Sequence, residues 1–229
     1  MRARRTGLRR NEMRAVLVTA AAVGSVALGP QVAWAEPDVC IAASGAEVAR
    51  MGTAECRATG TGSVAIARGA GSSASATGGD LNRVRVDGEN SFGFTLAGNR
   101  NTVTVTGDNS GAFAGRGDNN TATVDGDNSE AAAGIGNNNT ATVEGDGSNA
   151  IATFGNDNTA TVEGDNSFAQ AARGDRNTAT VDGDGSDAFS GLGNDNTATV
   201  NGNGSAADAF APQGCTAEAI GDGQFAACP

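Results

Sequence analysis

Histidine, tyrosine and lysine are missing from the 229-residue chain, and there is a single Trp. Without histidine, no Ser-His-Asp or Cys-His pair of nucleophile and base can be built. A zinc site would also be expected to use histidine or closely paired cysteines. Carboxylates occur in every repeat, but a glycosidase needs two particular ones in a cleft, which the uniformly short turns do not form. We therefore expect a protein that is not an enzyme and has no cofactor.

Positive charge is scarce as well. Residues 1–35 hold six of the 15 basic residues and one of the 26 acidic residues. Residues 36–229 therefore carry nine Arg against 25 Asp and Glu, a net charge of −16. A surface of this sign repels nucleic acid and anionic lipid, so we expect no nucleic-acid partner.

Residues 1–35 have the organisation of a signal peptide. Six Arg residues precede an apolar run that begins at Ala15, and Ala33-Trp34-Ala35 provides a cleavage site. The Arg9-Arg10 pair also resembles a twin-arginine signal, but Glu12 fits that motif poorly, so ordinary secretion is favoured. Because no membrane-spanning stretch follows, we expect a secreted or cell-surface protein whose exported chain does not insert into membranes.

The exported part is dominated by a strict 19-residue repeat. Each of seven copies begins with Asn and has Val four residues later, most often as Asn-Thr-Ala-Thr-Val. The repeated residues are Asn82, Asn101, Asn120, Asn139, Asn158, Asn177 and Asn196. A fixed period near 20 residues without helical spacing is typical of a solenoid, in which each coil buries its apolar side against its neighbours.

Glycine marks two corners of each coil. One glycine precedes the Asn by three residues and another follows it by six, as Gly117 and Gly126 do around Asn120. Glycine supplies the positive φ that tight turns need. Between the corners the residues alternate with period two, which predicts two short strands with small apolar residues such as Ala122 and Val124 facing inward. Buried Asn and Ser at the corners are expected to form ladders that satisfy the turn backbone.

The predicted fold is therefore all-β, a β-solenoid (parallel β-helix or β-roll) of 19-residue coils with two short strands each. Weaker copies at both ends, with Gly60 in register upstream and Cys215 in the Asn position downstream, give about nine coils. At about 4.8 Å per coil the rod would be about 40 Å long. After the signal peptide we expect an N-terminal cap at 36–59, the solenoid at 60–214 and a capping coil at 215–229.

Four cysteines lie outside the seven clear coils, two before them and two after. Export makes disulfides plausible, and four cysteines allow three pairings. The ends of the rod are much further apart than the roughly 7 Å that a disulfide can span between Cα atoms, so only Cys40–Cys56 and Cys215–Cys228 remain. Such bridges would staple the ends, where a bare sheet edge otherwise invites pairing between chains.

Segments of the repeat resemble known bacterial surface proteins. Gly62-Ser63-Val64-Ala65-Ile66-Ala67 and the residues 126–133 look like coils in the head domains of trimeric autotransporter adhesins. The Gly-x-x-Asn-x-Ala-x-Val half-repeat is also similar to curlin, the subunit of bacterial amyloid fibres. The resemblance covers about residues 60–228 and implies a cell-surface or extracellular β-solenoid, without carrying over a binding site.

A stacked array of outward threonines is one candidate site. A rigid Thr-x-Thr lattice resembles the ice-binding face of insect and bacterial antifreeze solenoids, although threonine is also a soluble β-branched residue that suits any exposed strand. The array consists of Thr102, Thr104, Thr121, Thr123, Thr140, Thr142, Thr159, Thr161, Thr178, Thr180, Thr197 and Thr199.

Acidic residues at the corners are a weaker candidate, for Ca²⁺. Carboxylates stacked about 5 Å apart repel one another, and a bound cation would relieve the repulsion. The candidates are Asp125, Asp127, Asp146, Asp165 and Asp184. The EF-hand pattern fails because Glu130 occupies the position where that loop needs glycine. Solvated turn carboxylates, screened by salt, are the favoured interpretation.

The second strand of each coil carries apolar residues that we predict to face outward. They are Phe92, Phe94, Phe113, Ile151, Phe168 and Phe189. Exposed Phe on a secreted rod indicates a self-association or partner surface, unless the two sides of that strand are the reverse of the prediction. We therefore expect a non-enzymatic, secreted or cell-surface solenoid with a structural or adhesive role, and an ice-binding protein as the alternative. The sequence does not identify the partner.

Overall fold

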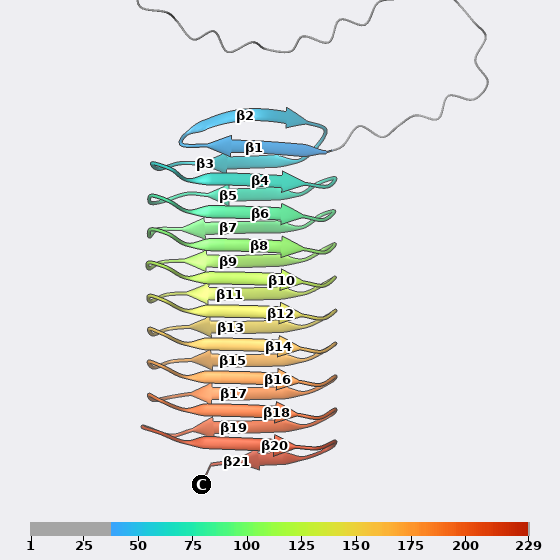
Figure 1. The fold of residues 1–229 in the computed structure, drawn as a ribbon, viewed down its shortest axis with the longest axis vertical. Coiled ribbons are helices and arrows are strands. Elements are labelled where there is room, and N and C mark those ends of the chain that lie inside the picture. The colour runs from blue at the N-terminus through green and yellow to red at the C-terminus, as the bar shows by residue number, and fades with distance from the viewer. Residues whose placement is uncertain (1–37, 229) are drawn as a thin grey trace, which may run out of the picture. The chain divides into compact units, whose positions relative to one another are not determined.

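The computed structural model describes residues 38–228, so the predicted signal peptide lies outside the described part of the chain. Every regular element in that part is a β-strand, and no helix there is long and apolar enough to cross a membrane. Figure 1 shows the strands stacked in two layers, with consecutive strands from β2 onward alternating between them. The predicted all-β solenoid is confirmed.

Two sheets run along the stack, with strand orders β2-β1-β4-β6-β8-β10-β12-β14-β16-β18-β20 and β21-β19-β17-β15-β13-β11-β9-β7-β5-β3. Sheet A contains β1 (Val39–Ala43), β2 (Ala46–Met51), β4 (Val64–Arg68), β6 (Arg83–Asp87), β8 (Thr102–Thr106), β10 (Thr121–Asp125), β12 (Thr140–Glu144), β14 (Thr159–Glu163), β16 (Thr178–Asp182), β18 (Thr197–Asn201) and β20 (Thr216–Ile220). Sheet B contains β3 (Glu55–Ala58), β5 (Ser73–Ala76), β7 (Phe92–Leu96), β9 (Gly111–Gly115), β11 (Glu130–Gly134), β13 (Asn149–Thr153), β15 (Phe168–Ala172), β17 (Asp187–Gly191), β19 (Ala206–Phe210) and β21 (Phe225–Ala227).

Each coil contributes one strand to each sheet, and nine coils run from the β4–β5 pair to the β20–β21 pair. Equivalent residues of successive coils lie side by side in parallel register, as Thr121 beside Thr140 and Val124 beside Val143. The backbone bonding continues around the corners, where the Gly126 N–H donates to the Thr106 carbonyl at 3.0 Å. Neighbouring coils are therefore bonded along both strands and through the corners, which fixes their spacing.

The core between the sheets is thin and built almost entirely from Ala and Val. In the coil of β10 and β11, Ala122, Val124, Ala131 and Ala133 are fully buried, while the alternating residues keep some exposure. The predicted inward and outward assignment is thus confirmed on both sheets. Small side chains are required here because the two strands of one coil are joined by tight corners and lie close together.

The N-terminal end departs from the solenoid pattern. Strand β1 pairs antiparallel with β4 on one side and with β2 on the other, so a hairpin covers the end of sheet A. The Cys40–Cys56 disulfide, with a Cα–Cα distance of 5.5 Å, ties β1 to β3. The sequence predicted a cap in this region, but not its antiparallel direction.

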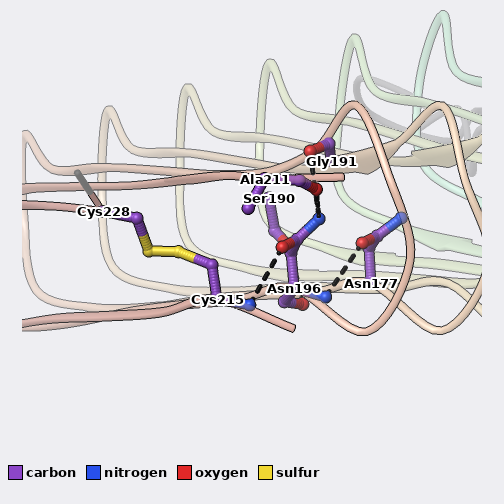
Figure 2. Close-up of a disulfide and its surroundings, with 7 residues drawn as sticks. All are labelled: Asn177, Ser190, Gly191, Asn196, Ala211, Cys215 and Cys228. Atoms are coloured by element: carbon purple, nitrogen blue, oxygen red, sulfur yellow. Dashed lines mark hydrogen bonds between the residues drawn. A yellow bond between two sulfur atoms is a disulfide. The ribbon is translucent and has the colours of Figure 1, made fainter. Parts of the chain in front are cut away.

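The C-terminal end is closed by the second disulfide, which joins Cys215 and Cys228 across the last coil with a Cα–Cα distance of 6.3 Å. Figure 2 shows that Cys215 takes the place that Asn occupies in the other coils: its N–H donates to Asn196 Oδ1 at 3.1 Å. Because Cys215 offers no amide oxygen in turn, the side-chain ladder described below ends at this coil. Both predicted disulfides are confirmed.

Candidate functional site

Buried asparagines hold one corner in seven of the nine coils, with Ser63 in that position in the first coil and Cys215 in the last. The N–H of Asn139 donates to Asn120 Oδ1 at 2.9 Å, and Asn139 Oδ1 accepts from the N–H of Asn158 at 3.1 Å. Asn139 Nδ2 also donates to the carbonyl of Gly155 at 2.8 Å. Because these asparagines are fully buried, water does not reach the corner backbone. Each side-chain hydrogen bond therefore satisfies a backbone group that would otherwise have no partner. The predicted Asn ladder is confirmed.

Buried serines hold the opposite corner in the same way. The N–H of Ser148 donates to Ser129 Oγ at 3.1 Å, and the Ser129 hydroxyl donates to the carbonyl of Gly145 at 2.7 Å. In both ladders the side chain of one coil accepts from the backbone of the following coil. The surfaces of the solenoid are therefore presented on a frame that is fixed at both corners.

The acidic corner residues form a third ladder, on the outside. Asp146 Oδ1 accepts from the N–H of Asp127 at 2.8 Å, Asp165 Oδ1 from Asp146 at 2.8 Å, and Asp184 Oδ1 from Asp165 at 2.9 Å. This ladder points the other way, because each side chain accepts from the preceding coil. The sequence interpretation of these carboxylates as free solvated groups missed this structural role, although the 19-residue repetition of Asp beside Gly was a visible signal.

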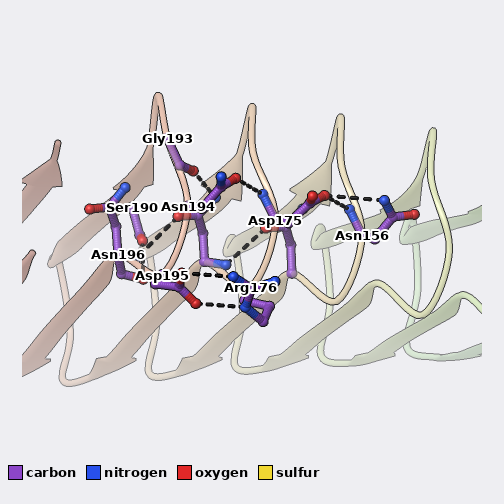
Figure 3. Close-up of polar contacts among 10 residues, drawn as sticks. Asn156, Asp175, Arg176, Ser190, Gly193, Asn194, Asp195 and Asn196 are labelled. Carbon is purple, nitrogen blue, oxygen red and sulfur yellow. Dashed lines mark hydrogen bonds and ion pairs between the residues drawn. The ribbon is translucent and has the colours of Figure 1, made fainter. Parts of the chain in front are cut away.

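The same outer ladder occurs at the corner that precedes sheet A, where each coil has either Asn or Asp in the position. Figure 3 shows Asp175 Oδ1 accepting from the N–H of Asn156 at 2.7 Å, while the N–H of Asp175 donates to Asn194 at 2.8 Å. Beside it, Arg176 Nε lies 2.6 Å from Asp195 Oδ1 in an exposed ion pair. The hydrogen bond from Arg176 holds the pKa of Asp195 below its ordinary value.

Calcium binding stays a prediction. One carboxylate oxygen of Asp127, Asp146, Asp165 and Asp184 is already used by a backbone N–H, and Asp125 lies at the end of β10 next to Glu144. Within residues 38–228, no group of three or more His, Cys, Asp or Glu side chains is arranged to hold a metal ion.

The outward side of sheet A carries the threonine array. Thr121, Thr140 and Thr159 lie beside one another in one file, and the second file runs two residues further along each strand. The first file extends one coil beyond the prediction, because Thr197 pairs with Thr216, whereas the second ends at Glu218. At the other end, Arg83 and Arg85 occupy the two files. The structure therefore places all twelve predicted threonines in two unbroken files over six coils.

The outward side of sheet B carries the predicted apolar residues, so the reversed assignment of that strand is excluded. Phe94 packs on Phe113 with ring centroids 4.8 Å apart, and Phe168 packs on Phe189 at 5.2 Å. Gly111 leaves room for the ring of Phe92, which a Cβ at this position would displace. The phenylalanines thus pack along the stack while part of each ring stays exposed.

Six large, exposed apolar residues of this side were missed by the sequence analysis: Leu96, Ile135, Phe154, Leu192, Phe210 and Phe225. Phe210 extends the second cluster, with its centroid 6.4 Å from that of Phe189, and Phe154 and Leu192 lie in the bordering turn with exposed fractions of 55% and 57%. For Phe154 and Leu192 the signal was a spacing of 19 residues from Ile135 and Arg173, at a turn position to which no face had been assigned. A hollow on this side is lined by Gln170, Ala172, Arg173, Ser190, Leu192 and Phe210.

One carboxylate on the sheet B side is perturbed. Partial burial beside the aromatic cluster raises the pKa of Asp187, and the negative charge of Asp208 on the next coil raises it further. The ionised form of Asp187 is therefore disfavoured at this position.

Comparison of the chain with protein-family models, with curated proteins and with solved structures found no match in any of the three.

Proposed function

We propose that this protein is an exported, non-catalytic solenoid with a structural or adhesive role at the cell surface, and that it binds its partner through the outward side of sheet B. One observation carries the proposal. Eight of the twelve exposed large apolar side chains in the described part lie on sheet B or in the turn that borders it, namely Phe92, Phe94, Leu96, Ile135, Phe154, Leu192, Phe210 and Phe225. Exposed apolar patches of this kind are typical of interaction surfaces.

The charge distribution also favours the outward side of sheet B as the binding surface. The acidic ladders lie at the corners, and the outward positions of sheet A from β8 to β18 hold threonine or a polar or acidic strand-end residue. Sheet B is the one long surface where desolvation would release water from apolar area. The likeness of the coils to adhesin head repeats agrees with a surface role.

The test is binding of the purified exported chain to the envelope of the cells that produce it. Phe94→Ser and Phe189→Ser remove one aromatic ring from each cluster, and Thr123→Ser and Thr142→Ser are matched controls on sheet A. We expect the double Phe variant to bind at least tenfold more weakly and the double Thr variant to bind like the wild type. Equal binding of both variants to the envelope would refute the proposal, provided that circular dichroism shows both variants to be folded.

Ice binding is the second candidate, favoured by the unbroken register of the threonine files. Their expected spacings, about 4.8 Å between coils and about 6.7 Å along a strand, repeat without interruption over six coils. Replacement of Thr140, Thr159 and Thr178 by Tyr should abolish ice-crystal shaping and thermal hysteresis, while Ile151→Tyr on sheet B should leave both intact. Freely growing round crystals with the wild-type protein, with or without calcium, would remove this candidate.

A further inference from the structure

We infer that the outward side of sheet B also pairs with the same side of a second copy of this chain, forming a two-fold dimer whose two stacks run in opposite directions. The inference rests on the proposed function, since it uses the same surface, so a second copy and the envelope partner compete for that surface. The size of the face, the positions of its bulky residues and the positions of its charges support this dimer.

The size of the face matches what a stable dimer needs. Ten strands at about 4.8 Å and five residues at about 3.3 Å give an area of roughly 800 Å². A specific interface of standard size buries about 800 Å² on each partner. The face is also continuous, because every strand of sheet B is in parallel register with the next.

The central file of sheet B has a phenylalanine at each end of its bulky stretch and smaller or polar side chains between them. In chain order this file holds Phe94, Phe113, Ala132, Ile151, Gln170 and Phe189. A two-fold axis that inverts the stack halfway between Ala132 and Ile151 sets Phe94 of one copy against Phe189 of the other. Phe113 then faces Gln170 of the other copy and Ala132 faces Ile151, so a large side chain meets a smaller one and the same pairs form twice, as an isologous interface requires.

Charge favours the inverted arrangement over the parallel one. The next residue of the central file is Asp208, and the residue before Phe94 in the file is Ser75. With inverted stacks, Asp208 faces Ser75 of the partner. With parallel stacks it would face Asp208 of the partner, and two carboxylates at a desolvated interface repel.

Sedimentation velocity of the exported chain between 1 and 200 µM tests the dimer. We expect the wild-type chain to form a dimer in a concentration-dependent way. Ile151→Glu should raise the dissociation constant of the dimer at least 100-fold. Thr161→Glu, which adds the same charge on sheet A, should dimerise like the wild type. Ala132→Arg is a second disrupting variant should Ile151→Glu fail to fold. A wild-type chain that is monomeric throughout, or equal behaviour of Ile151→Glu and Thr161→Glu, would overturn the inference.

Cross-linking tests the orientation. In a mixture of Phe94→Cys and Phe189→Cys chains, a short bis-maleimide should join one variant to the other and leave each variant alone largely unlinked. Efficient linking of Phe94→Cys to itself would overturn the inverted arrangement. A monomeric chain that still loses envelope binding in the Phe94→Ser and Phe189→Ser variant would refute the dimer and leave the proposed function standing. If the chain is a dimer but the Phe94→Ser and Phe189→Ser variant still binds the envelope, the dimer would stand and the proposed function would be refuted.

Discussion

At the scale of single residues, the buried polar ladders make the corners sensitive to substitution. Asn139→Ala would leave the N–H of Asn158 and the carbonyl of Gly155 without partners inside the protein. We expect a loss of about 2–4 kcal/mol in the free energy of unfolding, measured by urea denaturation. Asn149→Ala is the matched control, because the buried Oδ1 of Asn149 has no hydrogen-bond partner. A cost for Asn149→Ala as large as that for Asn139→Ala would contradict the ladder argument.

The perturbed acid on sheet B gives a prediction about pH. The pKa of Asp187 is raised above 3.8 in the folded chain, so its ionised form disfavours folding at neutral pH. Asp187→Asn should therefore raise the melting temperature at pH 7. The gain should shrink as the pH falls through the raised pKa and vanish below about 3.8, where both states bind the proton.

Asp208→Asn should give a smaller gain over the same pH range, because the charge of Asp208 is the second cause of the shift after burial. Melting curves from pH 3 to pH 8 measure both variants. A gain for Asp187→Asn that is constant with pH would show that side-chain packing, and not ionisation, is responsible.

The role of a single residue could be predicted from the sequence where the same residue type recurs in the repeat and its buried side chain must form hydrogen bonds. Asn139 and its equivalents were predicted as ladder residues because a buried amide must find partners. The carboxylates of Asp127 and Asp146 were interpreted only as charges, since an exposed side chain does not have to bond and its backbone partner lies a whole coil away in sequence. Their role in the ladder depends on coil spacing, which only the structure supplies.

At the scale of the element, the corners restrict residue choice more than the strands do. Gly107 has a φ of 129°, and a Cβ there would overlap the carbonyl of Gly126 in the next coil. Gly185 has a φ of 61°, and a Cβ there would meet no other atom within 4 Å. We expect Gly107→Ala to cost more than about 2 kcal/mol and Gly185→Ala about 1 kcal/mol, by thermal or urea unfolding.

Gly185→Asn is the control for this pair. Asn128 and Asn166 occupy the same corner position in other coils with φ values of 55° and 53°, so asparagine is tolerated there. A near-neutral result for Gly185→Asn together with a large loss for Gly107→Ala would assign the cost to the stacked carbonyl. Equal losses for Gly107→Ala and Gly185→Ala would mean that backbone strain alone decides.

Two elements could not be predicted from the pattern. Strand β2 exposes every residue, so it lacks the alternation by which the other strands were recognised. Its partner β1 alternates normally, but its direction is set by the hairpin turn at Ser44 and Gly45, both at positive φ. Alternation identifies which side of a strand is buried and says nothing about the direction in which the strand runs.

At the scale of the whole described stack, each coil contacts mainly the coils on either side of it, so the coil is the unit that can be removed. Deleting residues 142–160 joins Ala141 to Thr161 and restores the repeat with one coil fewer. We expect a folded chain whose denaturant m-value falls by roughly one ninth, because stability and buried surface in such stacks are nearly additive.

Deleting residues 142–159 removes one residue less and should have a much larger effect. Ala141 is then followed by Ala160, so either Asn139 or Val162 must turn from the core to solvent. A register error of one residue cannot be absorbed in a strand whose neighbours on both sides are fixed. We expect loss of the cooperative urea transition for this chain, whereas retention of wild-type unfolding by both deletions would show that the strands, unlike the corners, tolerate a change of register.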